Sequence, residues 1–235
     1  MSLTVKKVFS QAGKYFKQRK MPWRFRIVGV FIRGFLRNPV KALHYVRGIT
    51  LDMKTTYRFN LHIYGKKFLQ DVLEESGKLG MRPFLLWGTL LGCVREGGFL
   101  DHDYDIDIGI LAQDYSKKDA LIKAMLSRGY RLRFDHPYKF SFELQDRLLH
   151  LDVDLLYDFK GLLIVSKTSE RTGKMAANYF PKEAFQELRP RLFLDDLEVW
   201  IPCDADKVLT FIYGDWRTPV KEHDYESGLK NKISD

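Results

Sequence analysis

The sequence contains little cysteine. Its 235 residues include only two, Cys93 and Cys203. Two cysteines cannot form the disulfide framework that stabilises small secreted domains, and they do not make a Cys/His cluster of the kind that binds structural zinc. We therefore expect a protein of a reducing compartment, the cytosol.

Long apolar runs are missing as well. No stretch of about 18 apolar residues occurs, and no positively charged start, apolar middle and small-residue cleavage site opens the chain. The pattern predicts neither secretion nor a membrane-spanning helix. The hydrophobic content of 45% is ordinary, and a chain of this length can bury one substantial core.

Acidic residues are absent from residues 5–48, within a chain of net charge +9. Aromatic and aliphatic residues alternate there with lysine and arginine, and Pro22 and Pro39 divide the segment into expected helices at about 3–18, 23–37 and 39–49. Such a basic amphipathic segment suits a membrane interface with anionic lipid. The alternative is a helical arm that packs on a catalytic domain and exposes a basic face. No recognition motif supports nucleic-acid binding, so we expect none.

Three carboxylates alternate in the middle of the chain. Asp103, Asp105 and Asp107 are two residues apart, so an extended strand would place them on one face, with Ile106 and Ile108 on the other. Carboxylates so close repel one another unless a cation lies between them. Hard oxygen ligands favour Mg²⁺ or Mn²⁺, and the spacing therefore predicts a divalent metal site.

A glycine turn precedes these carboxylates. The short apolar strand expected at 83–87 runs into Gly88 and Thr89 and then into a helical stretch. Free backbone N–H groups at a helix N-terminus bind anions, so we expect Gly88 and Thr89 to meet a diphosphate. Arg95 could pair with a phosphate or bridge to a surface carboxylate. Weaker candidates for donor or acceptor contacts are Lys139, Lys167, Arg171 and Lys174.

A second alternating set follows at His150, Asp152 and Asp154. If its strand neighbours the first carboxylate strand, one of the two aspartates completes a site for one or two metal ions. For His150 we expect a hydrogen-bonded, half-buried side chain rather than a metal ligand.

Three stretches resemble the LicD and fukutin-related family, whose members share the nucleotidyltransferase fold of DNA polymerase beta. They are WGTLLGCVREGGFLDHDYDIDIGI at 87–110, HLDVDL at 150–155, and IPC at 201–203 with YGDWRTP at 213–219. The family pattern points to Asp154 as the metal ligand of the second set. Asp152 is the alternative, and could instead take the proton of the acceptor hydroxyl.

The resemblance implies metal-dependent transfer of a phospho-alditol or phosphocholine group from a CDP-activated donor to a glycan hydroxyl. The acceptor would be a capsule, teichoic-acid or lipopolysaccharide glycan, in some cases lipid-linked, at the inner face of the membrane. Two rivals remain. One is a nucleotidyltransferase that moves NMP from an NTP to a sugar or sugar phosphate; the other is a non-catalytic membrane adaptor.

The expected class is α/β (α+β), a nucleotidyltransferase-like mixed sheet with flanking helices and a basic helical arm. We expect the arm at 1–56, the catalytic domain at 57–220 and a polar tail at 221–235. The patterns predict helices at 57–79, at 116–128 and from 204 or 206 to 213. They predict strands at 104–111, 130–134, 139–144, 148–157, 162–165 and 192–201.

Overall fold

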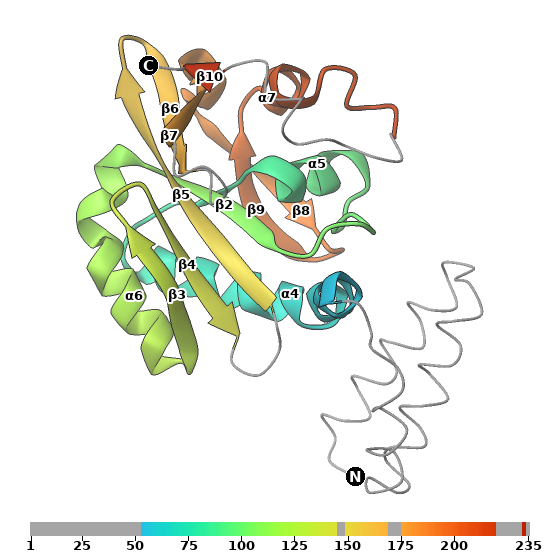
Figure 1. Cartoon of the computed structure of the whole chain (residues 1–235), viewed down its shortest axis with the longest axis vertical. Coiled ribbons are helices and arrows are strands. Elements are labelled where there is room, and N and C mark those ends of the chain that lie inside the picture. The colour runs from blue at the N-terminus through green and yellow to red at the C-terminus, as the bar shows by residue number, and fades with distance from the viewer. Residues whose placement is uncertain (1–52, 145–148, 169–174, 220–231, 234–235) are drawn as a thin grey trace, which may run out of the picture. The chain divides into compact units, whose positions relative to one another are not determined.

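The computed structural model describes residues 53–144, 149–168, 175–219 and 232–233 (Figure 1). The chain divides into two compact units, Met1–Phe59 and Asn60–Asp235, and the second contains the sheet and the candidate site. The helices expected at 3–18, 23–37 and 39–49, the membrane contact of residues 5–48 and most of the tail lie outside the described residues.

The described residues form one mixed sheet of ten strands. Its order is β10-β7-β6-β5-β2-β1-β9-β8, and β4 pairs with β5 and with β3. The long strand β5 is central, because β2 pairs with it in parallel while β4 and β6 pair with it antiparallel. The strands are β1 Phe84–Leu85, β2 Ile106–Leu111, β3 Tyr130–His136, β4 Lys139–Leu144, β5 Leu149–Phe159, β6 Leu162–Thr168, β7 Met175–Pro181, β8 Leu188–Phe193, β9 Leu197–Pro202 and β10 Lys232–Ile233.

Four α-helices accompany the sheet: α4 Met53–Lys78, α5 Trp87–Arg95, α6 Lys118–Ser127 and α7 Ala205–Tyr213. Two 3₁₀ helices, η1 Ala112–Lys117 and η2 Lys182–Phe185, complete the described elements. Figure 1 shows α6 along β3, and α5 beside α7. Among the described residues, no helix has both the length and the apolar character needed to cross a bilayer.

The pattern of buried side chains explains why α4 forms a helix and why β2 and β5 form strands. The apolar stripe of α4 is fully buried at Leu61, Phe68 and Val72, and the Phe68 ring stacks on Tyr130 with centroids 4.5 Å apart. Alternate residues of β2 and β5, such as Ile108 and Val153, are also fully buried. The opposite face of these two strands is therefore left for polar side chains.

The fold class is confirmed as a mixed sheet with flanking helices. Both ends of α7 also follow the prediction. At its start, the Asp204 carboxylate accepts from the Lys207 N–H at 3.0 Å, and at its end Gly214 follows with φ +70°.

Three details of the prediction are wrong. The strand expected at 192–201 is the hairpin β8–β9, which turns at Leu194 and Asp195, both at positive φ. The strand β7 was not predicted. The helix expected from Ser116 begins instead with η1 and becomes α-helical at Lys118, without a side-chain cap.

Candidate active site

The pairing of three strands gathers the carboxylates on one face of the sheet. In the parallel pair of β2 and β5, Asp107 lies opposite Asp152. In the antiparallel pair of β4 and β5, Ser141 lies opposite Asp152 and Lys139 opposite Asp154. We call Asp105, Asp107, Asp152 and Asp154 the carboxylate face. The condition set for a shared site, that the strands of the two alternating sets are neighbours, is therefore met.

Asp152 is held by two partners. The Ser141 hydroxyl donates to its Oδ1 at 2.6 Å, and the Lys139 ammonium lies 2.7 Å from its Oδ2. Burial disfavours ionisation of Asp152, but the charge and hydrogen bond of Lys139, together with Ser141, outweigh it and lower the pKa of this carboxyl.

Asp154 is buried more deeply and is held differently. The indole Nε1 of Trp87 donates to its Oδ2 at 2.7 Å, while Lys139 lies 3.4 Å from its Oδ1. Burial raises the pKa of Asp154, and Lys139 and Trp87 offset only part of this rise. Burial disfavours the charged form of Lys139, but Asp154 and Asp152 outweigh it and raise the pKa of Lys139, so the ammonium stays charged.

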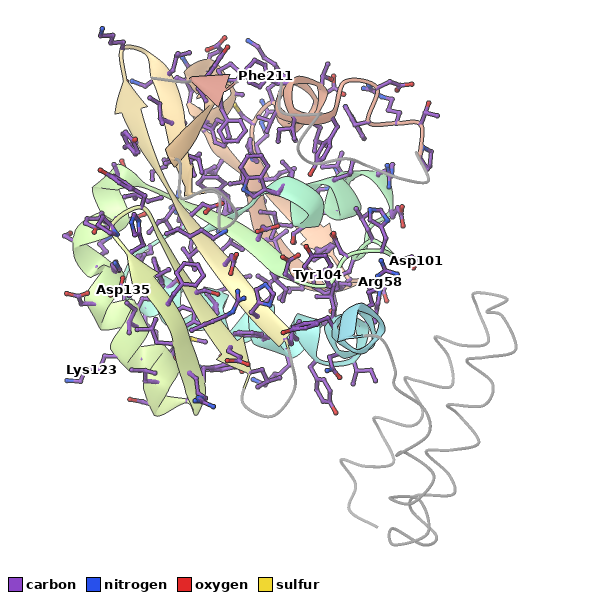
Figure 2. All side chains as sticks on the ribbon, viewed as in Figure 1. Arg58, Asp101, Tyr104, Lys123, Asp135 and Phe211 are labelled. Carbon is purple, nitrogen blue, oxygen red and sulfur yellow. The ribbon has the colours of Figure 1, made fainter. Side chains whose placement is uncertain are left out.

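Asp107 lies in surroundings that disfavour its negative charge. Burial and then the nearby Asp105 raise its pKa well above the ordinary carboxyl value, and Lys139 compensates only in part. Asp105 itself lies 3.5 Å from His150 Nε2, and His150 is buried more deeply than the predicted half-buried side chain. Burial, followed by Asp105 and Asp107, also raises the pKa of Tyr104, which remains 38% exposed beside the face. Figure 2 shows Tyr104 and Asp101 on the loop that leads into β2.

Hydrogen bonds join the start of helix α5 to the strand that carries Asp107. The Asp107 N–H donates to the Thr89 hydroxyl oxygen at 2.9 Å, and the Leu86 N–H donates to the Asp107 carbonyl at 3.1 Å. The first helical residue, Trp87, has φ +48°, which is rare for a bulky side chain and marks a strained backbone. The side chain of the N-cap residue, Leu86, makes no hydrogen bond to this helix N-terminus.

Gly88 permits a close approach at the same point. A Cβ on Gly88 would lie 2.6 Å from Oδ2 of Asp103, a distance that atoms do not tolerate. Asp103 is only 4% exposed and lies in the turn before β2, where its N–H donates to the Leu100 carbonyl. The expectation of three aspartates on one strand is therefore wrong: β2 begins at Ile106, and Asp103 packs against the start of α5 instead.

Arg95 is turned toward the C-terminal motif. Its guanidinium donates to the Trp216 carbonyl at 3.1 Å and to the Glu96 carboxylate at 3.0 Å. Of the two predicted roles, the structure shows the bridge to a carboxylate. A contact between Arg95 and a donor phosphate stays a prediction.

Within the described residues, no three His, Cys, Asp or Glu side chains converge as a ready-made metal site. The chemistry of the carboxylate face nevertheless fits a hard divalent cation. Asp105 and Asp107 could supply oxygen ligands, and burial and Asp105 raise the pKa of Asp107, an environment in which a bound cation would stabilise the ionised carboxylate. Metal binding by Asp103, Asp105, Asp107 and Asp154 remains a prediction.

Two important residues were missed or underrated. Lys139 was one of several weak candidates because an isolated lysine is usually exposed. Its position could be found only by pairing β4 with β5, which places it opposite Asp154. Trp87 was assigned to an apolar strand, and nothing in the sequence signals its hydrogen bond to Asp154.

Comparison with known proteins agrees with this geometry. The sequence model of the family described as LicD/FKTN/FKRP, nucleotidyltransferase domain, matches residues 80–204, a range that contains the whole carboxylate face. The chain belongs to this family.

Relatives occur in animals and bacteria. The human protein named ribitol-5-phosphate transferase FKTN is 28% identical over 187 residues, which cover 77% of this chain and 39% of that protein. Its mouse counterpart is 30% identical over 176 residues, 71% of this chain and 36% of that protein. An uncharacterised protein of Rickettsia prowazekii is 26% identical over 80% of this chain and 69% of its own length. The chain thus spans about two fifths of the length of the FKTN proteins it matches.

Among solved structures, the chain is similar to ANT(2")-Ia in complex with adenylyl-2"-tobramycin. The identity is 13%, and the match covers 58% of this chain and 67% of that one with a TM-score of 0.41. A similarity of this size supports no argument about function.

Proposed function

We propose that this chain transfers a phospho-alditol or phosphocholine group from a CDP-activated donor to a glycan hydroxyl, with Mg²⁺ or Mn²⁺ as cofactor. Phosphoribitol is the first candidate, because the FKTN relatives are named ribitol-5-phosphate transferases. The observation that supports the proposal is the carboxylate face itself, with Asp107, Asp152 and Asp154 on two paired strands and Asp105 just before β2, in a chain of this family.

The residues fall into two groups around the donor. Asp105 and Asp107 would hold the metal, with Asp154 as a third ligand and Asp103 nearby at the start of α5. The metal would supply charge neutralisation at the diphosphate. The N-terminus of α5, at Gly88 and Thr89, would bind a phosphate through its N–H groups. The oxygen of Thr89 already accepts from Asp107, so only its O–H is left to donate.

In the reaction, the acceptor oxygen attacks the phosphorus that carries the alcohol. A new P–O bond forms, the bond to CMP breaks, and CMP leaves with its electron pair. Asp152 would take the proton of the acceptor hydroxyl. Its contacts with Lys139 and Ser141 fix the orientation of the carboxylate and lower its pKa, which keeps it in the ionised form that can accept a proton.

The test is release of CMP from CDP-ribitol, and from CDP-choline, with Mg²⁺ and a glycan acceptor. We expect CMP from the wild type, and a loss of at least about a hundredfold in Asp107→Asn. Asp158→Asn is the matched control, because Asp158 lies on β5 as well but is exposed and paired with Lys182.

Each rival predicts another result. A nucleotidyltransferase would release pyrophosphate from an NTP and leave the CDP-linked donor intact. A non-catalytic adaptor would release neither product. The acceptor at a cell-surface polysaccharide, a lipid-linked form of it and a location at the cytoplasmic face of the membrane belong to the same proposal.

A further inference from the structure

The ammonium of Lys139 lies between Asp152 and Asp154 of β5. Its Nζ is 2.7 Å from Asp152 Oδ2 and 3.4 Å from Asp154 Oδ1, and the side chain is only 23% exposed. This half of the carboxylate face therefore already contains a cation, and the cation belongs to the protein.

The half formed by β2 differs. In the part of the chain that the structure describes, Asp105 and Asp107 form no ion pair with lysine or arginine, and Asp105 has only His150 at 3.5 Å. Positive charge is thus distributed unevenly over the face. The β5 half has a cation in direct contact, whereas Lys139 compensates the β2 half only in part.

We infer that the site binds a single divalent ion, on the β2 side at Asp105 and Asp107, and that Lys139 takes the place of a second ion between Asp152 and Asp154. The inference rests on the metal dependence in the proposed function and deepens it. The looser contact of Lys139 with Asp154 leaves Oδ1 of that carboxylate able to serve as a third ligand of the single ion.

Electrostatics supports this division. A second divalent ion at the β5 pair would lie within a few ångströms of the ammonium and would be repelled by it. Displacing Lys139 would instead leave a largely buried ammonium without its two partners, which is strongly unfavourable. Both routes to a two-metal site are therefore costly while Lys139 is present.

The test counts bound Mn²⁺ per full-length chain, with Mn²⁺ alone as the probe, by titration calorimetry and by the electron paramagnetic resonance signal of free Mn²⁺. We expect one bound ion in the wild type and two in Lys139→Met. The first ion should bind to Lys139→Met with a Kd at least about tenfold lower than that of the wild type. Lys139→Arg keeps the cation and should bind one. The matched control, Lys182→Met, removes the lysine paired with Asp158 farther along β5 and should also bind one.

Two ions in the wild type, or a single ion in a folded Lys139→Met with unchanged affinity, would overturn the inference. If Lys139→Met does not fold, as judged by circular dichroism, the wild-type and Lys139→Arg counts still decide. Failure of the proposed function looks different: the ion counts hold, but no CMP is released from a CDP-linked donor. A wild type without any ion would contradict both.

Discussion

At the scale of single residues, the proposed metal ligand Asp107 lowers the stability of the fold. Its folded-state pKa is raised above the ordinary 3.8, first by burial and then by Asp105. A carboxyl whose pKa is raised on folding lowers stability as the pH rises from its unfolded to its folded pKa, and the penalty persists at neutral pH. The negative charge of Asp107 that would bind a metal thus lowers the stability of the metal-free protein.

Asp107→Asn should therefore make the metal-free protein more stable at neutral pH, although it abolishes most turnover. We expect a higher melting temperature than the wild type in chelator, and a difference that shrinks as the pH falls toward 3.8. Thermal unfolding across a pH series measures it. Asp119→Asn, in an exposed position on α6, serves as control and should leave the melting temperature unchanged. A variant that melts below the wild type at neutral pH would show that the Asp107 charge is already neutralised.

Trp87 offers a second test at this scale. Its indole N–H donates to Asp154 at 2.7 Å, and its ring packs against Phe180 with centroids 5.4 Å apart. Trp87→Phe keeps an aromatic ring but leaves Asp154 without this donor. A hydrogen bond to a charged group contributes about 1.5–3 kcal/mol, so we expect kcat to fall by about tenfold to a hundredfold.

Trp200→Phe is the matched control for Trp87→Phe. Trp200 is also half-buried, but it lies on β9 and packs against Arg82 at 5.0 Å. Its replacement should leave kcat near the wild-type value. Equal losses in both variants would mean that Trp87 acts through general packing and not through Asp154.

At the scale of elements, the junction between α5 and the loop before β2 depends on one missing methyl group. Gly88→Ala would place a Cβ 2.6 Å from the buried Asp103 carboxylate, so the loop or the helix must shift. We expect a lower melting temperature and a loss of donor binding, measured by thermal unfolding with and without CDP-ribitol and Mg²⁺.

Gly77→Ala shows whether that effect is steric. Gly77 lies in α4 with nothing within 4 Å of an added Cβ, so the substitution should stabilise the helix by about 0.5–1 kcal/mol. Combining Gly88→Ala with Asp103→Ala should restore part of the lost stability, because it removes the atoms that clash. No restoration would place the fault in the helix itself.

The local sequence pattern predicted most of the helices and strands, but few of the contacts between their side chains. Alternation predicted that Asp107, Asp152 and Asp154 share one face, because a period of two is a property of the strand alone. It misplaced Asp103, since the sequence does not show that β2 starts only at Ile106. The contacts of Lys139 and Trp87 depend on strand order and on a backbone at positive φ, and both are set by tertiary packing.

At the scale of the whole molecule, the basic segment of residues 5–48 predicts a contact with the membrane. Removal of residues 1–48 should leave a folded domain that binds CDP-ribitol with Mg²⁺ but no longer sediments with anionic liposomes. Salt should weaken vesicle binding of the full chain, since screening reduces attraction to anionic lipid. Unchanged sedimentation of the truncated protein would assign the segment to packing on the domain.

The mass of the glycan acceptor after reaction tests the central claim most directly, because it records which group has moved. The reaction contains the full chain, Mg²⁺, CDP-ribitol, CTP and an acceptor glycan, and mass spectrometry compares the acceptor before and after. The account predicts an acceptor heavier by one phosphoribitol, with CMP in equal amount and neither product in Asp107→Asn. An acceptor heavier by a cytidine monophosphate, with pyrophosphate released from CTP, would contradict it.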